Sequence, residues 1–117
     1  MSPSGGGKYT MSSLEPEAAA AQLQCRNSIN KMMQCLDVGD SEGFALLFTT
    51  DGVISIARAN AVRKGREEIA RLCDHLHATF KGCTHWEGNA VMEHHPDRQT
   101  ITNRSYWRAL RGWSMCL

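Results

Sequence analysis

Residues 35–53, CLDVGDSEGFALLFTTDGV, decide the fold class, because they contain the end of one helix, the whole of a second and the turn into a strand. Gly39 ends the first helix, since glycine tolerates the left-handed backbone that commonly follows a helix. Asp40 or Ser41 caps the second helix with its side-chain oxygen. The apolar residues of that short helix follow helical spacing and are Phe44, Leu47 and Phe48. The segment therefore predicts a long helix followed by a short one.

The chain before this segment predicts a long first helix, which begins at about Leu14 with Ser13 as its N-cap. Its apolar stripe recurs at helical spacing and consists of Cys25, Ile29, Met32, Met33 and Leu36. Residues 1–13 are rich in Gly and Ser and have few apolar anchors, so we expect a flexible tail. Residues 14–117 then form a single domain, since 117 residues leave room for one core.

The chain after residue 52 predicts strands and one further helix. Residues 53–57 form a strand after the Asp51-Gly52 turn, and residues 58–65 are ambiguous between a short strand and a loop. A third helix lies between Gly65 and Gly82. Its apolar residues keep helical spacing and are Ile69, Leu72, Cys73, Leu76 and Phe80.

The last part of the chain predicts a long hairpin, with strands at about 84–94 and 99–110 joined by the His95-Pro96-Asp97-Arg98 turn. Strands linked this closely pair in antiparallel order, because a parallel pair needs a longer crossover. The element order therefore predicts the α+β class. A long N-terminal helix on the concave face of a curved antiparallel sheet would form a cone with an internal pocket.

The balance of charge and the lack of long apolar runs exclude several kinds of partner. Thirteen basic residues face twelve acidic ones, for a formal net charge of +1, so no broad basic surface is expected to bind nucleic acid. We find no apolar run of the roughly 18 residues that a membrane span needs, and no secretory signal. We therefore expect a cytoplasmic protein with no nucleic-acid or membrane partner.

Five cysteines are scattered along the chain without a CxxC pair, at Cys25, Cys35, Cys73, Cys83 and Cys116. The odd number and the apolar surroundings favour reduced thiols over disulfides. His75 and His77 are two residues apart on the third helix, so their side chains lie on different sides. We therefore expect neither a metal site nor a cofactor.

Two residues are candidates for a proton-transfer pair. Asp37 follows Leu36 at the end of the first helical stripe, and His85 lies near the start of the first long strand. A carboxylate beside an imidazole orients the ring and tunes its basicity. Asn89 shares a strand face with His85 by alternation and would donate to a carbonyl or enolate oxygen. The alternative is structural, with Asp37 ending a helix and His85 in solvent.

The last strand offers a second set of polar groups. Arg104, Tyr106 and Arg108 alternate onto one face, where an Arg or a Tyr could hold an anionic or carbonyl substrate. The alternative is a row of polar side chains on an exposed face. The sequence leaves open which face of the last two strands points inward.

Four segments together resemble the SnoaL-like branch of the nuclear-transport-factor-2-like superfamily. They are residues 35–53, KGREEIARLC at 64–73, THWEGNAVME at 84–93 and TNRSYW at 102–107. The resemblance implies the cone fold and, in dehydratase-like members, a working group of an Asp, a His and a helical Tyr. Asp37 and His85 match the Asp and the His. The Tyr position falls at Met32 or Met33, and methionine can neither donate nor accept a proton.

The resemblance implies a cofactor-independent lyase or isomerase that acts on a small hydrophobic carbonyl, polyketide-like or steroid-like compound. His85 would remove a proton α to a carbonyl, and Asp37 would orient and charge-stabilise the imidazole. Asn89 or Tyr106 would hold the developing oxyanion. The other expected substrate contacts are Arg104, Met33, Phe48 and Trp86. A non-catalytic ligand-binding or dimerisation domain of the same fold is the alternative.

The resemblance also implies a C-terminally shortened domain, because family members usually continue into one or two further strands. An open sheet edge favours self-association. Family members commonly dimerise through the sheet, so we expect a homodimer of this kind.

Overall fold

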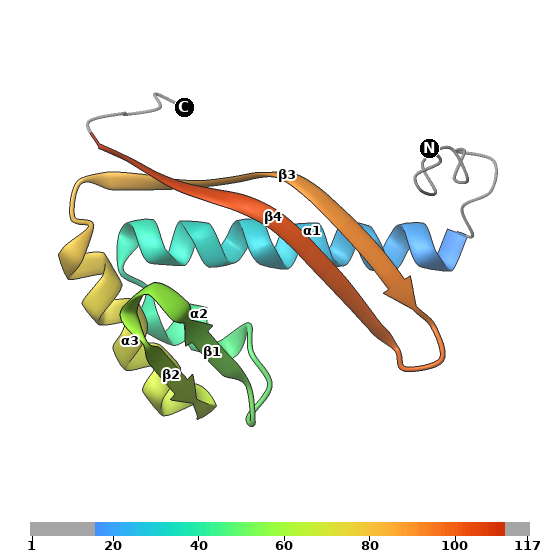
Figure 1. Ribbon diagram of the computed structural model, residues 1–117, viewed down its shortest axis with the longest axis horizontal. Helices are drawn as coiled ribbons and strands as arrows, with labels where there is room; N and C mark the ends of the chain where they lie inside the picture. The colour runs from blue at the N-terminus through green and yellow to red at the C-terminus, as the bar shows by residue number, and fades with distance from the viewer. Residues whose placement is uncertain (1–15, 112–117) are drawn as a thin grey trace.

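The computed structural model describes residues 16–111, in which helices precede and interrupt antiparallel strands (Figure 1). In chain order the elements are α1 (Pro16–Val38), α2 (Ser41–Leu46), β1 (Val53–Ile56), a 3-10 turn (Ala57–Ala59), β2 (Ala61–Lys64), α3 (Gly65–Thr79), β3 (Cys83–His95) and β4 (Thr100–Arg111). The predicted α+β class is therefore confirmed, and the ambiguous segment 58–65 contains the strand β2. The predicted tail, the Ser13 cap and the expected early end of the sheet lie outside the described residues.

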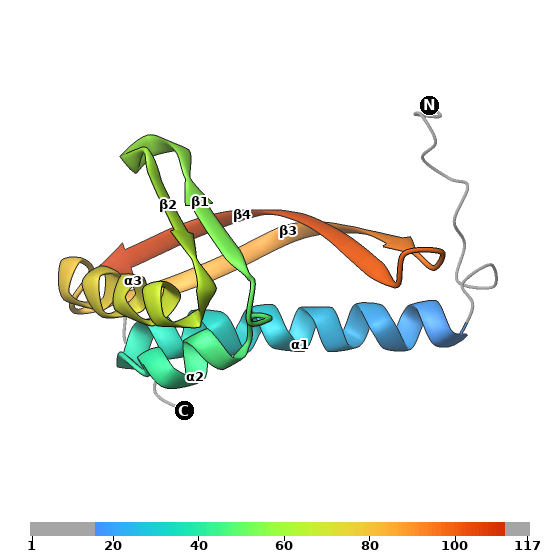
Figure 2. The same cartoon turned by 90° about the horizontal axis from the view of Figure 1, so that it is seen from below.

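The strands of the described residues form two antiparallel hairpins, β1–β2 and β3–β4. The long β3–β4 hairpin runs along α1 and bends over it in both views (Figures 1 and 2). The shorter hairpin, α2 and α3 gather at the C-terminal end of α1. The result is a curved antiparallel ribbon over a long N-terminal helix, as the cone requires.

The core lies where the C-terminal half of α1 meets α2 and α3. Its buried members are Met33, Leu36, Phe44, Ala45, Ile69 and Cys73. Each large apolar side chain buried here contributes about 1.5–3 kcal/mol. Burial, aided by the nearby Asp74 charge, raises the pKa of the Cys73 thiol to about 11, so this cysteine is an inert core residue. The core makes the end of α1 a rigid platform for the residues that follow Leu36.

The junction of α1 and α2 is held by a glycine turn and a capping carboxylate. Gly39 has φ +77°, and the backbone N–H groups of Gly39 and Asp40 both donate to Cys35 O at 2.9 Å. Asp40 Oδ1 accepts from the Gly43 N–H at 2.9 Å, so Asp40 rather than Ser41 is the N-cap. These bonds set the direction of the last turn of α1, where Asp37 lies.

Strand β3 contains a bulge between Gly88 and Val91. Asn89 occupies it with φ +53°, a conformation that asparagine tolerates better than most residues. The extra residue reverses the alternation along the strand. Before the bulge, residues 85 and 87, which are odd-numbered, are less exposed than residue 86 between them. From 90 to 94 the even-numbered residues are less exposed than the odd-numbered ones.

Candidate active site

Asp37 and His85 come together although 48 residues separate them in the chain. His85 Nδ1 lies 2.9 Å from Asp37 Oδ1, and the same oxygen accepts from the His85 backbone N–H at 2.8 Å. The Asp37 side chain is 22% exposed and the His85 side chain 12%. The expected convergence of the end of the first helix with the start of the first long strand is confirmed.

The contacts of the imidazole define its role. A carboxylate can only accept hydrogen bonds, so Nδ1 donates to Asp37, and in the neutral imidazole this leaves the lone pair on Nε2, where it can act as a base. Asp37 also bonds the strand backbone, which fixes the carboxylate relative to the ring. The Phe80 ring contacts His85 edge-on, with centroids 5.5 Å apart at 81°. The imidazole is therefore held in one orientation before any ligand binds.

His85 borders a hollow of about 670 Å³ that is largely apolar. Apolar side chains from α1, α2, α3 and both hairpins line it, among them Met32, Leu36, Phe44, Phe48, Leu76 and Trp107. Ser55, Arg58, His85 and Arg108 are the polar residues that border it, but Arg108 pairs with the exposed Trp86, so its side chain belongs to the outer face of the hairpin. Hollows of this size and apolar character bind drug-sized organic molecules.

Two of the apolar residues expected at the pocket, Phe48 and Met33, lie in different places. Phe48 lines the hollow. Met33 does not, because it is buried in the core between the helices, and its neighbour Met32 lines the hollow instead. Adjacent residues on a helix point about 100° apart, so an error of one position moves a side chain from the pocket to the core.

The expectation that Asn89 shares a face with His85 is wrong. Asn89 occupies the bulge of β3, its side chain is exposed, and it is not part of the hollow's lining. Simple alternation fails here because the bulge inserts one residue between the two positions.

Arg104, Tyr106 and Trp86, which we expected as substrate contacts, lie on the other face of the β3–β4 hairpin from His85. Tyr106 pairs with Gly88 and is 70% exposed, and Trp86 is 49% exposed. Arg104 is exposed as well, and none of the three lines the hollow.

Cross-strand pairing identifies the residues of β4 that sequence reasoning missed. Ala109 pairs with His85 and Trp107 pairs with Glu87, and paired residues of an antiparallel sheet share a face. Both Ala109 and Trp107 therefore line the hollow with His85. The sequence analysis could not identify these residues because the register of the hairpin was not known.

A buried ion pair that the sequence analysis missed links α1 to β3. Arg26 donates to both Glu87 carboxylate oxygens, at 2.6 and 2.9 Å, and the Glu87 side chain is 1% exposed. On β4, Asn103 Nδ2 donates to Ser105 Oγ at 3.4 Å, and both residues help to lower the pKa of this carboxyl group. Trp107 Nε1 donates to Ser105 Oγ at 3.0 Å, so the network reaches the wall of the hollow. Arg26 and Glu87 are 61 residues apart, and no local signal pairs them.

The network controls the protonation of Glu87. Burial alone would raise the pKa of the Glu87 carboxyl, but the hydrogen bonds and charge of Arg26, with those of Ser105 and Asn103, lower that pKa below 4.5. Glu87 is therefore ionised throughout the neutral range.

The lowered pKa of Glu87 predicts a loss of stability in acid. Below pH 4.5 the unfolded chain binds this proton before the folded chain does, so stability falls as the pH falls through the folded pKa. We expect the difference in free energy of unfolding between the wild type and Glu87→Gln to be largest above about pH 5 and to shrink below it. Urea unfolding between about pH 3 and pH 7 measures this difference. A difference that does not vary with pH would contradict the assignment.

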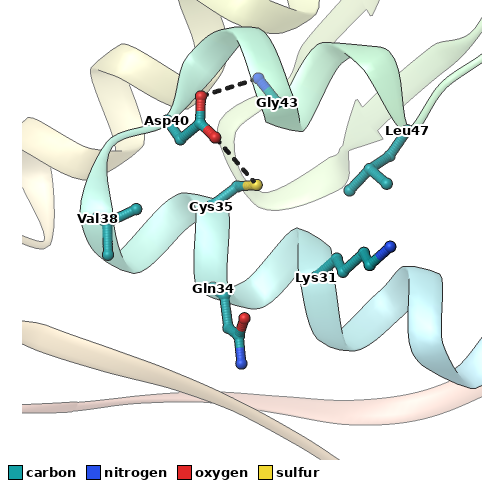
Figure 3. A pocket seen from close by; sticks show the side chains of 7 residues that line it. All are labelled: Lys31, Gln34, Cys35, Val38, Asp40, Gly43 and Leu47. Carbon is teal, nitrogen blue, oxygen red and sulfur yellow. Dashed lines mark hydrogen bonds between the residues drawn. The ribbon is translucent and has the colours of Figure 1, made fainter.

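A second hollow, of about 350 Å³, lies between α1 and α2 and shares no lining residue with the first. Figure 3 shows its Cys35 thiol directed at the Asp40 carboxylate, with Sγ 4.0 Å from Oδ2. Burial and the Asp40 charge raise the pKa of the Cys35 thiol. The thiol therefore stays protonated at neutral pH and is a poor nucleophile.

Residues 16–111 contain neither a metal-binding group nor a membrane-spanning helix. No three or more His, Cys, Asp or Glu side chains in this range form a group that could hold a metal ion. None of its helices combines the length and the apolar character of a membrane span.

Comparison with known proteins gives a family match. A family model described as a SnoaL-like domain matches residues 17–114. No curated protein matches the sequence.

Several solved structures are similar to this one. Aln2 from a Streptomyces species has a TM-score of 0.67 at 23% identity, over 82% of this chain and 66% of Aln2. ActVI-ORFA from Streptomyces coelicolor has a TM-score of 0.59 at 25% identity, over 80% of this chain and 66% of its own. An NTF2-like protein with a cystatin-like fold from Novosphingobium aromaticivorans has a TM-score of 0.56 at 25% identity, over 83% of this chain and 86% of its own. The chain thus spans slightly less than two thirds of the two Streptomyces proteins.

Proposed function

The chain belongs to the SnoaL-like domain family, and on that premise we propose that it is a cofactor-independent enzyme that transfers a proton on a small hydrophobic carbonyl compound. The family includes polyketide cyclases and dehydratases. The observation that carries the proposal is the Asp37–His85 pair at the edge of an apolar hollow. An oriented imidazole beside an apolar wall is suited to general base catalysis.

The proposed reaction begins with proton abstraction. His85 Nε2 takes the proton from a carbon next to a carbonyl, and the electrons of the C–H bond form an enolate. The negative charge of Asp37 stabilises the imidazolium that results. In an isomerase the imidazolium returns the proton to another carbon. In a lyase it protonates a departing β-hydroxyl group, which leaves as water while a C=C bond forms.

The developing oxyanion needs a donor, and the exposed Asn89 and Tyr106 are poorly located for this role. Ser55 borders the hollow, but it is exposed and alternates along β1 with the less exposed Ile54 and Ile56, so we assign no side chain to the carbonyl oxygen. Met32 lines the hollow at one of the two positions that match the family's tyrosine, so the mechanism uses His85 as its single proton carrier.

Deuterium exchange tests the proposal without knowledge of the natural substrate. 2-Tetralone, a bicyclic ketone with exchangeable α-protons, is incubated in D₂O with and without the protein. We expect the protein to accelerate the loss of the α-proton signal in ¹H NMR, in proportion to its concentration. Exchange at the buffer rate over a range of bicyclic ketones would contradict a proton-transfer function.

Replacing Asp37 with Asn tests the orienting carboxylate. The amide keeps the size of the side chain and can still accept from Nδ1–H, but it carries no charge to stabilise the imidazolium. We expect the exchange rate to fall by about 10- to 100-fold, a smaller loss than removal of the base itself. Asp74→Asn is the matched control, since Asp74 is exposed on α3 and lies outside the hollow's lining. An unchanged rate in Asp37→Asn would remove Asp37 from the mechanism.

A non-catalytic ligand-binding domain is the second candidate. It is favoured by Met32 in the hollow and by the exposure of Asn89 and Tyr106. Saturable binding of 2-tetralone without accelerated exchange would support this alternative.

The proposed homodimer would use the outer face of β3–β4, where Trp86 and Tyr106 are exposed. Sedimentation would measure whether the protein is a dimer.

A further inference from the structure

Trp107 presents a half-exposed indole to the hollow. It pairs with Glu87 across the β3–β4 hairpin, and the Glu87 carboxylate bonds Arg26 of α1, so Trp107 shares the face of the hairpin that is turned to the helix. Trp107 borders the hollow and is 50% exposed. Within residues 16–111 its indole forms no ring contact with another aromatic side chain. A large flat apolar surface is therefore left for a ligand to cover.

The polar edge of this indole is held by Ser105. Trp107 Nε1 donates to Ser105 Oγ at 3.0 Å, and the indole N–H has no other polar role, since it can only donate. Ser105 Oγ also accepts from Asn103 Nδ2 and helps to lower the pKa of Glu87, so it belongs to the network of the buried ion pair. The contact therefore fixes the edge of the ring and leaves the ring face available.

The rest of the lining is rich in aromatic rings. Three phenylalanines border the hollow together with the imidazole of His85, namely Phe44, Phe48 and Phe80. Aromatic rings attract one another in stacked or edge-on contacts beyond the effect of the area that they bury. A saturated ring of the same size buries a similar area but lacks the π-face. The lining therefore favours unsaturated rings.

We infer that Trp107 is a specificity-determining residue whose indole packs against a flat, unsaturated ring of the substrate, and that Ser105 is the positioning residue that holds the indole. The inference rests on the proposed function, because it assigns a substrate contact within the same hollow. It narrows the substrate from any small hydrophobic ketone to one with an unsaturated ring, and it disfavours saturated, steroid-like ring systems.

Two bicyclic ketones of similar size test the preference. 2-Tetralone contains an aromatic ring, whereas trans-2-decalone is fully saturated. Calorimetry measures the dissociation constant of each ketone. We expect wild-type protein to bind 2-tetralone about 3- to 10-fold more tightly than trans-2-decalone, the usual effect of one aromatic contact.

Trp86 provides a matched control for Trp107, since it is 49% exposed but lies on the opposite face of the same hairpin. In Trp107→Leu we expect the two ketones to bind with about equal affinity, because 2-tetralone loses its aromatic contact. Trp86→Leu should keep the wild-type preference. Circular dichroism of each variant verifies the fold.

Ser105→Ala tests the positioning role, because it removes the acceptor and leaves the indole in place. We expect the preference for 2-tetralone to fall to about twofold or less. The indole N–H signal of Trp107 in ¹H–¹⁵N NMR, assigned by its absence from Trp107→Leu, should move upfield as the hydrogen bond is lost. Ser105→Thr restores a hydroxyl and should restore both the preference and the signal. An unchanged preference and signal in Ser105→Ala would remove Ser105 from this role.

Several results would overturn the role of Trp107. They are the absence of binding of both ketones, equal affinity for the two in the wild type, a preference that survives in Trp107→Leu, and a preference that is lost equally in Trp86→Leu.

The outcomes also distinguish this inference from the proposed function. If 2-tetralone exchanges its α-protons but binds no more tightly than trans-2-decalone, the catalytic proposal stands and the role of Trp107 is wrong. If 2-tetralone is preferred through Trp107 but no bicyclic ketone exchanges, the hollow binds flat rings and the catalytic proposal fails.

Discussion

Replacing His85 with Gln is expected to slow the exchange of 2-tetralone α-protons by about 10²- to 10⁴-fold, the usual contribution of a general base. Glutamine resembles the imidazole in size and keeps a polar tip, but it cannot take up a proton at neutral pH. The side chain lies at the border of a hollow rather than in the core of the helices, so the fold should survive. The rate should therefore fall without a comparable loss of ligand binding.

His75 provides the matched control for this variant. It lies exposed on α3, outside the lining of the hollow, so His75→Gln should exchange protons at the wild-type rate. Saturable binding of 2-tetralone to His85→Gln verifies that the hollow is still formed. Wild-type exchange in a folded His85→Gln protein would eliminate His85 as the base and, with it, the proposed mechanism.

Replacing Glu87 with Gln is expected to destabilise the protein by about 3 kcal/mol. The substitution leaves the size of the side chain unchanged, so no cavity forms. Its cost arises because the Arg26 charge loses the carboxylate that it bonds at 2.6 and 2.9 Å. Arg26 is 29% exposed and retains some hydration, which places the estimate at the low end of the range for broken buried pairs.

Two variants isolate the origin of this loss. Glu67→Gln removes a surface pair with Arg71, whose side chains are 87% and 64% exposed, and should change stability by less than about 1 kcal/mol. Arg26→Met/Glu87→Leu removes both charges together and should recover most of the stability lost in Glu87→Gln. Urea unfolding at pH 7 measures all three. A Glu87→Gln variant as stable as the wild type would show that the pair contributes nothing.

The same buried pair illustrates what local sequence patterns miss. Glu87 belongs to a strand segment that alternates polar and apolar residues, and Arg26 belongs to the polar part of a helix. From its local sequence alone, each side chain would be predicted to be exposed to solvent. The pair forms only because the β3–β4 hairpin lies along α1, which joins positions 61 residues apart.

Asp37 and His85 were predictable as partners for a different reason. Asp37 is placed by Gly39 and Asp40, whose turn and cap are local features of the sequence. The position of His85 came from the resemblance of its segment to the SnoaL-like family. The prediction that Asn89 shares a face with His85 was wrong because strand alternation assumes a regular ladder. The bulge between Gly88 and Val91 interrupts that ladder.

The sequence by itself determined the α+β class and the order of helices and strands, because helix ends, turns and apolar periodicity depend on neighbouring residues. The pairing of Asp37 with His85 came from the family resemblance. Only the tertiary structure decided which residues face the hollow: Met32 rather than Met33, and Trp107 rather than Tyr106. Hairpin register and helix rotation set these choices, and both arise from packing between segments far apart in the chain.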